Sequence, residues 1–329
     1  MKQRSLLVMV LLMFTQVAVA SLSNNFQFNG KGNWSIDALG STSAAIGDLR
    51  ASIPTGSTVE AAFLYQSTND NAVVPGVTFG STLLAGSDWT DLGTAAGFLT
   101  AFRADVTAQV TATVGSGGIT PFTFSVVESN SNLQDGVSLV VVYSNPNEVE
   151  RTIALLDGFS DPNGDSVNIT LSNPLTAAQL ADPNFEAQLS LGIGFGFQPS
   201  GQFSQVDING QRLTTSAGGQ DDGSANNGAL ITVGDTFDDD FLNNPIDPFE
   251  LATSVRTDDE AYNLISFLNA GDTQISIDTL NPSNDDNIFF SGINITAVAN
   301  VNTNVVPEPG SIFLLSLGLL GFRVMRHKK

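Results

Sequence analysis

Short segments in which apolar and polar residues alternate recur along most of this chain of 329 residues. The run Leu139–Tyr143 is apolar on both faces, which is typical of a strand at the centre of a sheet. Asn209-Gly210 predicts a tight hairpin turn. Residues 166–172 alternate cleanly, and residues 59–65 place four side chains on one face: Val59, Ala61, Phe63 and Tyr65. We therefore expect a mainly β fold, as a β-sandwich or jelly-roll-like body.

Helix signals are few. Asp258 is a candidate N-cap, apolar residues at helical spacing follow it, and Gly271 is a stop signal. A short helical turn is expected within residues 175–183, ending before Pro183. The sequence thus predicts one or two short helices beside the strands.

One expected strand, residues 189–197, has an unusual composition. Large apolar residues occupy one face of this segment, and Gly192, Gly194 and Gly196 occupy the other. A glycine face without side chains allows another backbone to approach closely.

The charge of the chain is strongly acidic. The net charge is −21, and residues 21–306 hold six basic against 32 acidic residues, a net charge of −26. Such a surface repels nucleic acid and anionic lipid and attracts cations. The chain contains no cysteine, which excludes disulfides and thiolate chemistry.

The N-terminus has the pattern of a secretory signal peptide over residues 1–20. Lys2 and Arg4 precede the apolar run Leu6–Phe14, and Ala18 and Ala20 form a small-residue cleavage signal. We expect cleavage after Ala20, so that the mature chain begins at Ser21.

The C-terminus combines a polar spacer, residues 299–306, with an apolar run of twelve residues, Ser311–Phe322. A membrane-spanning helix needs about 20 residues. The basic end, residues 326–329, favours the cytoplasmic side. We expect a single hydrophobic C-terminal helix that resides in the inner membrane only transiently.

The same end resembles the PEP-CTERM sorting signal of Gram-negative bacteria, which would span residues 307–329. The matching residues are Pro307, Glu308 and Pro309, then the apolar stretch, then a basic end with Arg323 and Arg326. The resemblance implies processing by an exosortase, a membrane-embedded enzyme, followed by release or attachment at the cell surface. It also implies an association with exopolysaccharide and biofilm.

The body, residues 21–298, contains a second resemblance. Residues 59–171 are similar to a β-rich module of bacterial surface proteins, through Arg103–Thr107, Asp135–Tyr143, Arg151 and Asp157–Phe159. This resemblance brings no catalytic residue with it. A subdivision of the body near Asn173 is an alternative to one domain.

Candidate catalytic groups are limited to carboxylates. His327 in the basic tail is the only histidine, which removes a Ser-His-Asp triad from the body. A glycoside hydrolase needs only two carboxylates, for which the candidates are Glu128, Glu148, Glu150, Glu186 and Glu260. A sugar-binding groove would draw on the aromatic residues other than Phe, which are Trp34, Trp89, Tyr65, Tyr143 and Tyr262.

Calcium is the one cofactor that the sequence suggests. Asp161, Asn163 and Asp165 stand at alternate positions, the oxygen spacing of the first half of a calcium loop. Ser166 and Ser172 occupy the places where an EF-hand has its glycine and glutamate, so a solvated turn is the alternative.

These observations lead to one main hypothesis and two alternatives. We expect an exported, non-enzymatic surface or matrix protein whose partners are an exosortase and extracellular polysaccharide or other matrix proteins. The first alternative is a carbohydrate-binding module, which burial of the Trp and Tyr residues would argue against. The second is a glycan-acting hydrolase, which would require two carboxylates in one cleft.

Overall fold

A computed structural model describes residues 21–40, 45–69, 74–95, 97–194, 203–215, 217–218, 231–237, 260–284 and 287–303. These residues belong to one compact unit of the chain. Their strands form three antiparallel sheets, so the prediction of a mainly β fold is confirmed.

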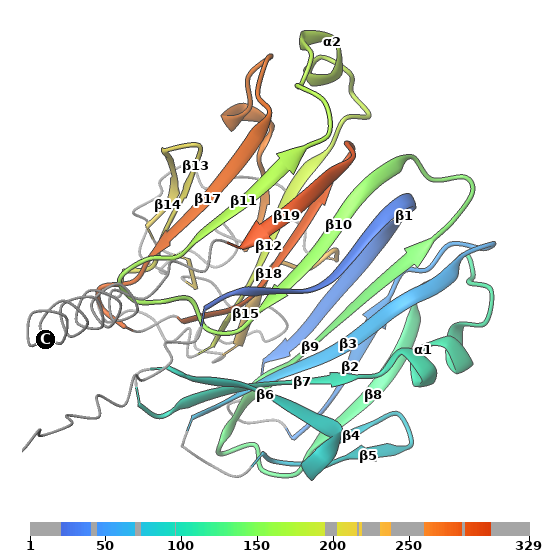
Figure 1. The fold of residues 1–329 in the computed structure, drawn as a ribbon. Helices are drawn as coiled ribbons and strands as arrows, with labels where there is room; N and C mark the ends of the chain where they lie inside the picture. Colours follow the sequence, from blue (N-terminus) through green and yellow to red (C-terminus); the bar gives the residue numbers. More distant parts are fainter. Residues whose placement is uncertain are drawn as a thin grey trace, which may run out of the picture. The chain divides into compact units, whose positions relative to one another are not determined.

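The largest sheet has ten strands in the order β15-β12-β18-β10-β1-β9-β3-β7-β6, with β16 also paired to β12. The strands are β1 (Ser23–Gly40), β3 (Thr58–Asn69), β6 (Trp89–Ala95), β7 (Leu99–Asp105), β9 (Gln134–Ser144), β10 (Glu150–Asp157), β12 (Ala187–Gly194), β15 (Ile231–Val233), β16 (Ala261–Asn263) and β18 (Asn287–Ile295). β1 changes partner along its length: Ser23–Lys31 pairs with β10, and Gly32–Gly40 pairs with β9. β1 therefore joins two half-sheets, one built on β10, β18 and β12 and the other on β9, β3 and β7 (Figure 1).

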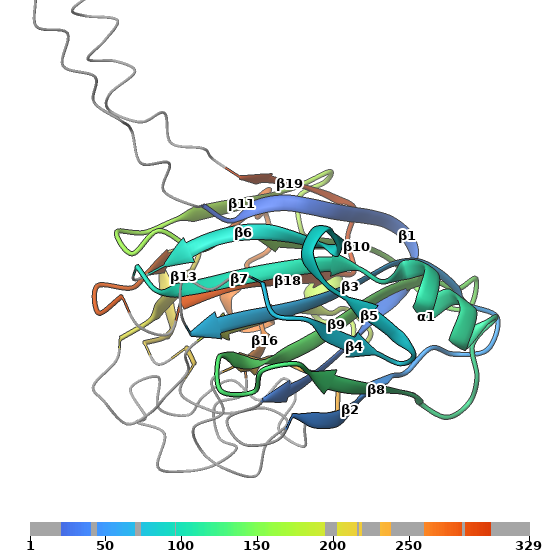
Figure 2. The same cartoon turned by 90° about the horizontal axis from the view of Figure 1, so that it is seen from below.

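Two smaller sheets lie on opposite sides of the body (Figures 1 and 2). The five-stranded sheet has the order β14-β13-β17-β11-β19, with β11 (Ser166–Leu171), β13 (Gln205–Ile208), β14 (Gln211–Thr214), β17 (Gln274–Leu280) and β19 (Ala299–Thr303). The four-stranded sheet has the order β2-β8-β4-β5, with β2 (Ile46–Ala51), β4 (Val77–Phe79), β5 (Thr82–Leu84) and β8 (Phe122–Glu128). The helices are α1 (Thr107–Val114), α2 (Ala177–Leu180) and two 3-10 turns, η1 (Gly86–Asp88) and η2 (Ile265–Phe267).

Three apolar clusters hold these sheets together. The inner core lies between the half-sheets, where the ring of Tyr65 on β3 is 5.0 Å from that of Phe290 on β18 although three strands separate them in the sheet. The first outer core packs β3, β7 and β9 on the four-stranded sheet and α1. The second outer core packs β10, β12 and β18 on the five-stranded sheet. Each half-sheet is thus buried on both faces, which explains apolar runs such as Leu139–Tyr143.

The face of β3 differs from the prediction at one residue. Ala61, Phe63 and Tyr65 point into the inner core as expected, but Val59 belongs to the first outer core. The pairing of β3 with β9 shifts between Val59 and Ala61, and the extra residue of this bulge reverses the face.

The prediction of a helix starting near Asp258 is wrong over the residues described from Glu260 onward. Ala261–Asn263 forms β16, and only the single 3-10 turn of η2 follows it. Leu264 N–H donates to the carbonyl oxygen of Ala187 on β12 at 2.8 Å, so tertiary pairing overrides the local helix signal. The predicted turn of helix near residue 177 is confirmed as α2, capped by Thr176.

The glycine face of β12 points into the inner core and receives side chains, not another backbone. A Cβ at Gly192 would lie 3.0 Å from Phe290 Cβ, and one at Gly194 would lie 3.0 Å from Ser67 Oγ. Another part of the chain therefore lies close to the glycine face, as expected, but it consists of side chains where we expected a backbone. Gly196 lies outside the described residues.

Candidate functional site

The inner core contains a buried ion pair that links the two half-sheets. Asp157 at the end of β10 accepts hydrogen bonds from Arg103 on β7 and from the hydroxyl of Tyr65, the latter at 3.2 Å. The Arg103 guanidinium also lies over the Phe63 ring, 5.5 Å from its centroid. Burial raises the pKa of Asp157, and the Arg103 guanidinium opposes that shift. The arrangement compensates a charge inside the core and exposes no reactive group.

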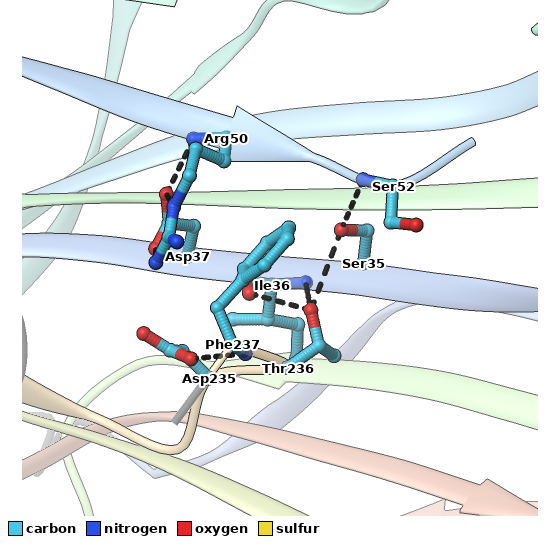
Figure 3. A network of polar contacts seen from close by, with 8 residues as sticks. All are labelled: Ser35, Ile36, Asp37, Arg50, Ser52, Asp235, Thr236 and Phe237. Atoms are coloured by element: carbon cyan, nitrogen blue, oxygen red, sulfur yellow. Dashed lines mark hydrogen bonds and ion pairs between the residues drawn. The ribbon is translucent and has the colours of Figure 1, made fainter. Parts of the chain in front are cut away.

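A second ion pair lies at the junction of β1 and β2 (Figure 3). Asp37 accepts from the backbone N–H of Arg50 and, at 3.4 Å, from its Nε and Nη2. The guanidinium carbon of Arg50 is 4.2 Å from the centroid of the Phe237 ring. Burial raises the pKa of Asp37, while Arg50 opposes the shift.

Hydroxyl groups extend this junction to the segment after β15 (Figure 3). Thr236 donates to the carbonyl oxygen of Ile36 from its N–H at 2.9 Å and from its Oγ1 at 3.0 Å. Ser35 Oγ accepts from the N–H of Ser52 at 2.9 Å. The junction therefore connects β1 to β2 and to the segment after β15, although Ile36 and Thr236 are 200 residues apart in the chain. We interpret it as a structural contact between these segments.

Asp135 and Glu128 are two further carboxyl groups that are buried in the body. Asp135 is fully buried, and its Oδ2 accepts from Ser67 Oγ at 2.9 Å. No donor among the described residues reaches its Oδ1. Burial raises the pKa of Asp135 to about 8; the bond from Ser67 opposes this shift and the charge of Glu128 adds to it. This shift favours the protonated form of Asp135, whose side chain has no contact with solvent.

The other candidate carboxylates for a hydrolase are spread over the body. Arg151 brings two of them together: its Nη1 donates to Glu186 at 2.7 Å, and its Nη2 lies 3.8 Å from Glu148. Both glutamates are therefore engaged by one guanidinium, whereas a glycoside hydrolase places its two carboxyl groups on either side of the scissile bond. Glu260 is buried and accepts from the Tyr262 hydroxyl at 2.9 Å, and Glu150 is exposed at the start of β10.

All Trp and Tyr side chains of the chain are buried. Their exposed fractions run from 0% to 7%, for Trp34, Trp89, Tyr65, Tyr143 and Tyr262. None of them can stack on a sugar from solvent. This burial counts against the carbohydrate-binding module considered from the sequence.

The turn predicted to bind calcium directs its carboxylates at nearby hydrogen-bond donors. Asp161 Oδ1 accepts from the N–H and the Nδ2 of Asn163, at 2.8 and 3.0 Å. Asp165 accepts from the N–H of Asp161 at 2.9 Å and from Ser21 Oγ at 3.1 Å. Burial raises the pKa of Asp165, and these donors oppose the shift. Calcium binding here stays a prediction.

Within the described ranges, no group of three or more Asp, Glu, His or Cys side chains is arranged to hold a metal ion. No described helix is long and apolar enough to cross a membrane. The signal-cleavage residues Ala18 and Ala20 and the sorting residues Pro307, Glu308, Pro309, Arg323 and Arg326 lie outside the described residues, as does the predicted C-terminal helix.

Sequence reasoning missed the residues that organise the polar interior. Each arginine that the structure describes forms an ion pair: Arg50, Arg103, Arg151 and Arg212. The scarcity of basic residues in so acidic a chain was the one sequence signal that these arginines have specific acidic partners. Which of the 32 acids pairs with each arginine depends on contacts between distant strands, and no spacing in the sequence encodes them.

Comparison with known proteins gives one match. Residues 305–329 match the PEP-CTERM protein-sorting motif, which contains all five predicted sorting residues. No curated protein and no solved structure matches the chain significantly. The chain therefore carries a PEP-CTERM sorting motif, and the motif implies an exported protein that is held transiently in the membrane and processed by an exosortase.

Proposed function

We propose that this protein is a non-enzymatic component of the bacterial surface or extracellular matrix, delivered by its two terminal signals and released from the inner membrane by an exosortase. The observation that carries the proposal is the sorting motif at residues 305–329, downstream of a β-rich body. The apolar run within the motif would serve as the transient membrane helix.

The two ends of the body support this delivery route. Ser21 contacts Asp165, immediately before β11, and Thr303 pairs with Val167 on β11. The leader and the sorting segment are thus attached to neighbouring points of one sheet. Because the leader and the sorting segment leave the body at the same place, either of them can hold the body at the same membrane.

The body supports a mechanical role better than a catalytic one. Its buried and partly buried carboxylates accept hydrogen bonds from arginines, hydroxyl groups and backbone amides, as Asp37, Asp157 and Asp165 do. These contacts stabilise the pairing of strands. We propose that the acidic surface associates with exopolysaccharide or matrix proteins in a biofilm, with divalent cations bridging acidic groups.

Intact-mass analysis of the protein from cells with and without exosortase tests the delivery. The expected mature species begins at Ser21 and lacks Arg323–Lys329 in cells that contain the enzyme, and it retains them in cells that lack it. A wild-type species that keeps this tail would reject the sorting role.

A sedimentation assay tests the matrix role. The mature protein should pellet with exopolysaccharide purified from the same cells, more strongly with calcium than with chelator, while an unrelated acidic protein stays in solution. Turnover of that polysaccharide by the mature protein would overturn the non-enzymatic proposal.

A further inference from the structure

The segment Asp157–Ser166 contacts the residue that becomes the first of the mature chain. Gly158 has φ +114°, and a Cβ there would lie 2.6 Å from the carbonyl oxygen of Ser21. Asp165 accepts the hydrogen bond from Ser21 Oγ at 3.1 Å. Two residues of one loop therefore lie against Ser21: Gly158 beside its carbonyl oxygen and Asp165 beside its hydroxyl group.

The neighbours of Ser21 fix the position of this contact. Leu22 is 2% exposed and packs in the second outer core, and its N–H donates to Asp165. Ser23 starts β1, and its Oγ donates to the carbonyl oxygen of Asp157 at 3.3 Å. Ser21 cannot move away from Asp165 unless Leu22 leaves the core.

Within the described residues, Asp165 accepts hydrogen bonds from neutral donors and forms no ion pair with a basic side chain. Its hydrogen bonds come from a hydroxyl and from backbone amides, and no Lys or Arg among the described residues forms an ion pair with it. The charge of another acid, Asp161, adds to the upward shift of its pKa. A partly buried carboxylate in this setting is stabilised by any positive charge placed within about 4–6 Å.

We propose that Asp165 is the counter-ion of the α-ammonium group that removal of the signal peptide creates on Ser21. The inference rests on the proposed export and on cleavage after Ala20. Hydrolysis of the Ala20–Ser21 amide by the signal peptidase consumes one water, leaves a carboxylate on Ala20 and leaves an amine on Ser21 that takes up a proton. Three covalent bonds separate this nitrogen from Ser21 Oγ, so it lies within about 4 Å of the oxygen that already contacts Asp165.

Maturation would therefore strengthen the attachment of β1, the strand that joins the two half-sheets. Before cleavage the carboxylate has only neutral donors; after cleavage it has an ion pair. The same carboxylate is one of the three predicted calcium ligands, and the proposal gives it a different partner.

A double-mutant cycle on the full chain, exported with its own leader and purified from cells, tests the proposal. One background has the native start, and the other has a Gly inserted between Ala20 and Ser21, which moves the ammonium one residue away. Asp165→Asn should lower the folding equilibrium constant about tenfold more in the native background, since hydrogen bonds to charged groups have that strength. Asp161→Asn, in the same turn, should cost the same in both backgrounds.

Intact mass establishes where each chain starts, and this separates the proposal from the export function. A native start at Ser21 with equal costs of Asp165→Asn in both backgrounds overturns the ion pair and leaves export intact. A start elsewhere overturns both the cleavage site and the ion pair. If Asp165→Asn does not fold, an aminopeptidase serves instead: it should remove the inserted Gly and stop at Ser21, and trimming past Ser21 overturns the proposal.

Discussion

Tyr65 and Tyr262 are both fully buried, and each donates its hydroxyl to a buried carboxylate, but they lie in different cores. Tyr65 is in the inner core, and its acceptor, Asp157, is 92 residues away on the opposite half-sheet. Tyr262 is in the second outer core, and its acceptor, Glu260, is two residues away. The first bond ties the halves of the body to each other, and the second stabilises one short segment.

This difference separates two kinds of core. The second outer core is lined mainly by aliphatic residues, including Val167, Ile169 and Leu171 from the regularly alternating strand β11. The inner core is rich in aromatic rings and contains the Arg103–Asp157 pair. We infer that the outer cores stabilise each half, whereas the inner core makes the body fold as a whole.

The largest expected effect is that of Tyr65→Ala. Loss of a buried aromatic side chain should lower the free energy of unfolding by about 4 kcal/mol. Because the ring contacts both half-sheets, hydrogen exchange should accelerate by a similar factor in β7 and β12. Tyr262→Ala, the matched variant, should accelerate exchange first around β16. Acceleration confined to β3 and its neighbours in Tyr65→Ala would show that the inner core does not couple the halves.

Arg103→Met should come next, with a cost of about 3 kcal/mol, because it leaves Asp157 buried without its cation. The Arg212–Asp207 pair is the control: the side chain of Arg212 is 35% exposed, and its replacement by Met should cost less than about 1 kcal/mol. Urea unfolding of the two variants measures the difference. Equal costs would mean that the inner pair is solvated and gives the halves no special link.

The sequence predicted the parts of the fold that depend on local pattern. The alternation of β11, the buried run of β9 and the hairpin at Asn209-Gly210 are all confirmed. The bulge at Val59, the strand at Ala261–Asn263 and the partners of the glycine face depend on contacts made elsewhere in the chain, which no local pattern records. The same holds for the candidate sites: the sorting motif is a linear signal and was found, whereas the partners of Asp37, Asp157 and Asp165 come from distant strands.

The pH dependence of stability at Asp135 gives a third test of the inner core. Asp135 accepts a hydrogen bond from Ser67, which follows Phe63 and Tyr65 at alternate positions of β3. Its pKa of about 8 in the folded protein lies above the unfolded value of 3.8, so the folded state binds the extra proton between these limits. The contribution of Asp135 to the free energy of unfolding is therefore greatest below pH 3.8, and it decreases as the pH rises toward 8. Asp135→Asn should therefore stabilise the protein at pH 8 and do so by less at pH 5, because the amide of Asn has no proton to lose. Thermal or urea unfolding at both pH values measures this effect, with Asp48→Asn on β2 as the exposed control. A gain that does not change with pH would mean that Asp135 is ionised in the folded protein.

The smallest expected effect belongs to Gly210→Ala, in the hairpin between β13 and β14. Asn209 and Gly210 have φ of +50° and +73°, and nothing lies within 4 Å of a Cβ at Gly210, so the cost is backbone strain alone, about 1 kcal/mol. Gly192→Ala is the comparison: its φ carries no such strain, but the added methyl group meets Phe290 and Phe289 in the inner core. It should therefore cost more than Gly210→Ala in urea unfolding and should accelerate hydrogen exchange in both half-sheets, whereas Gly210→Ala should affect only β13 and β14. If Gly210→Ala proved the more damaging of the two, the inner core would be loosely packed, and the distinction between a locally determined periphery and a collectively determined centre would fail.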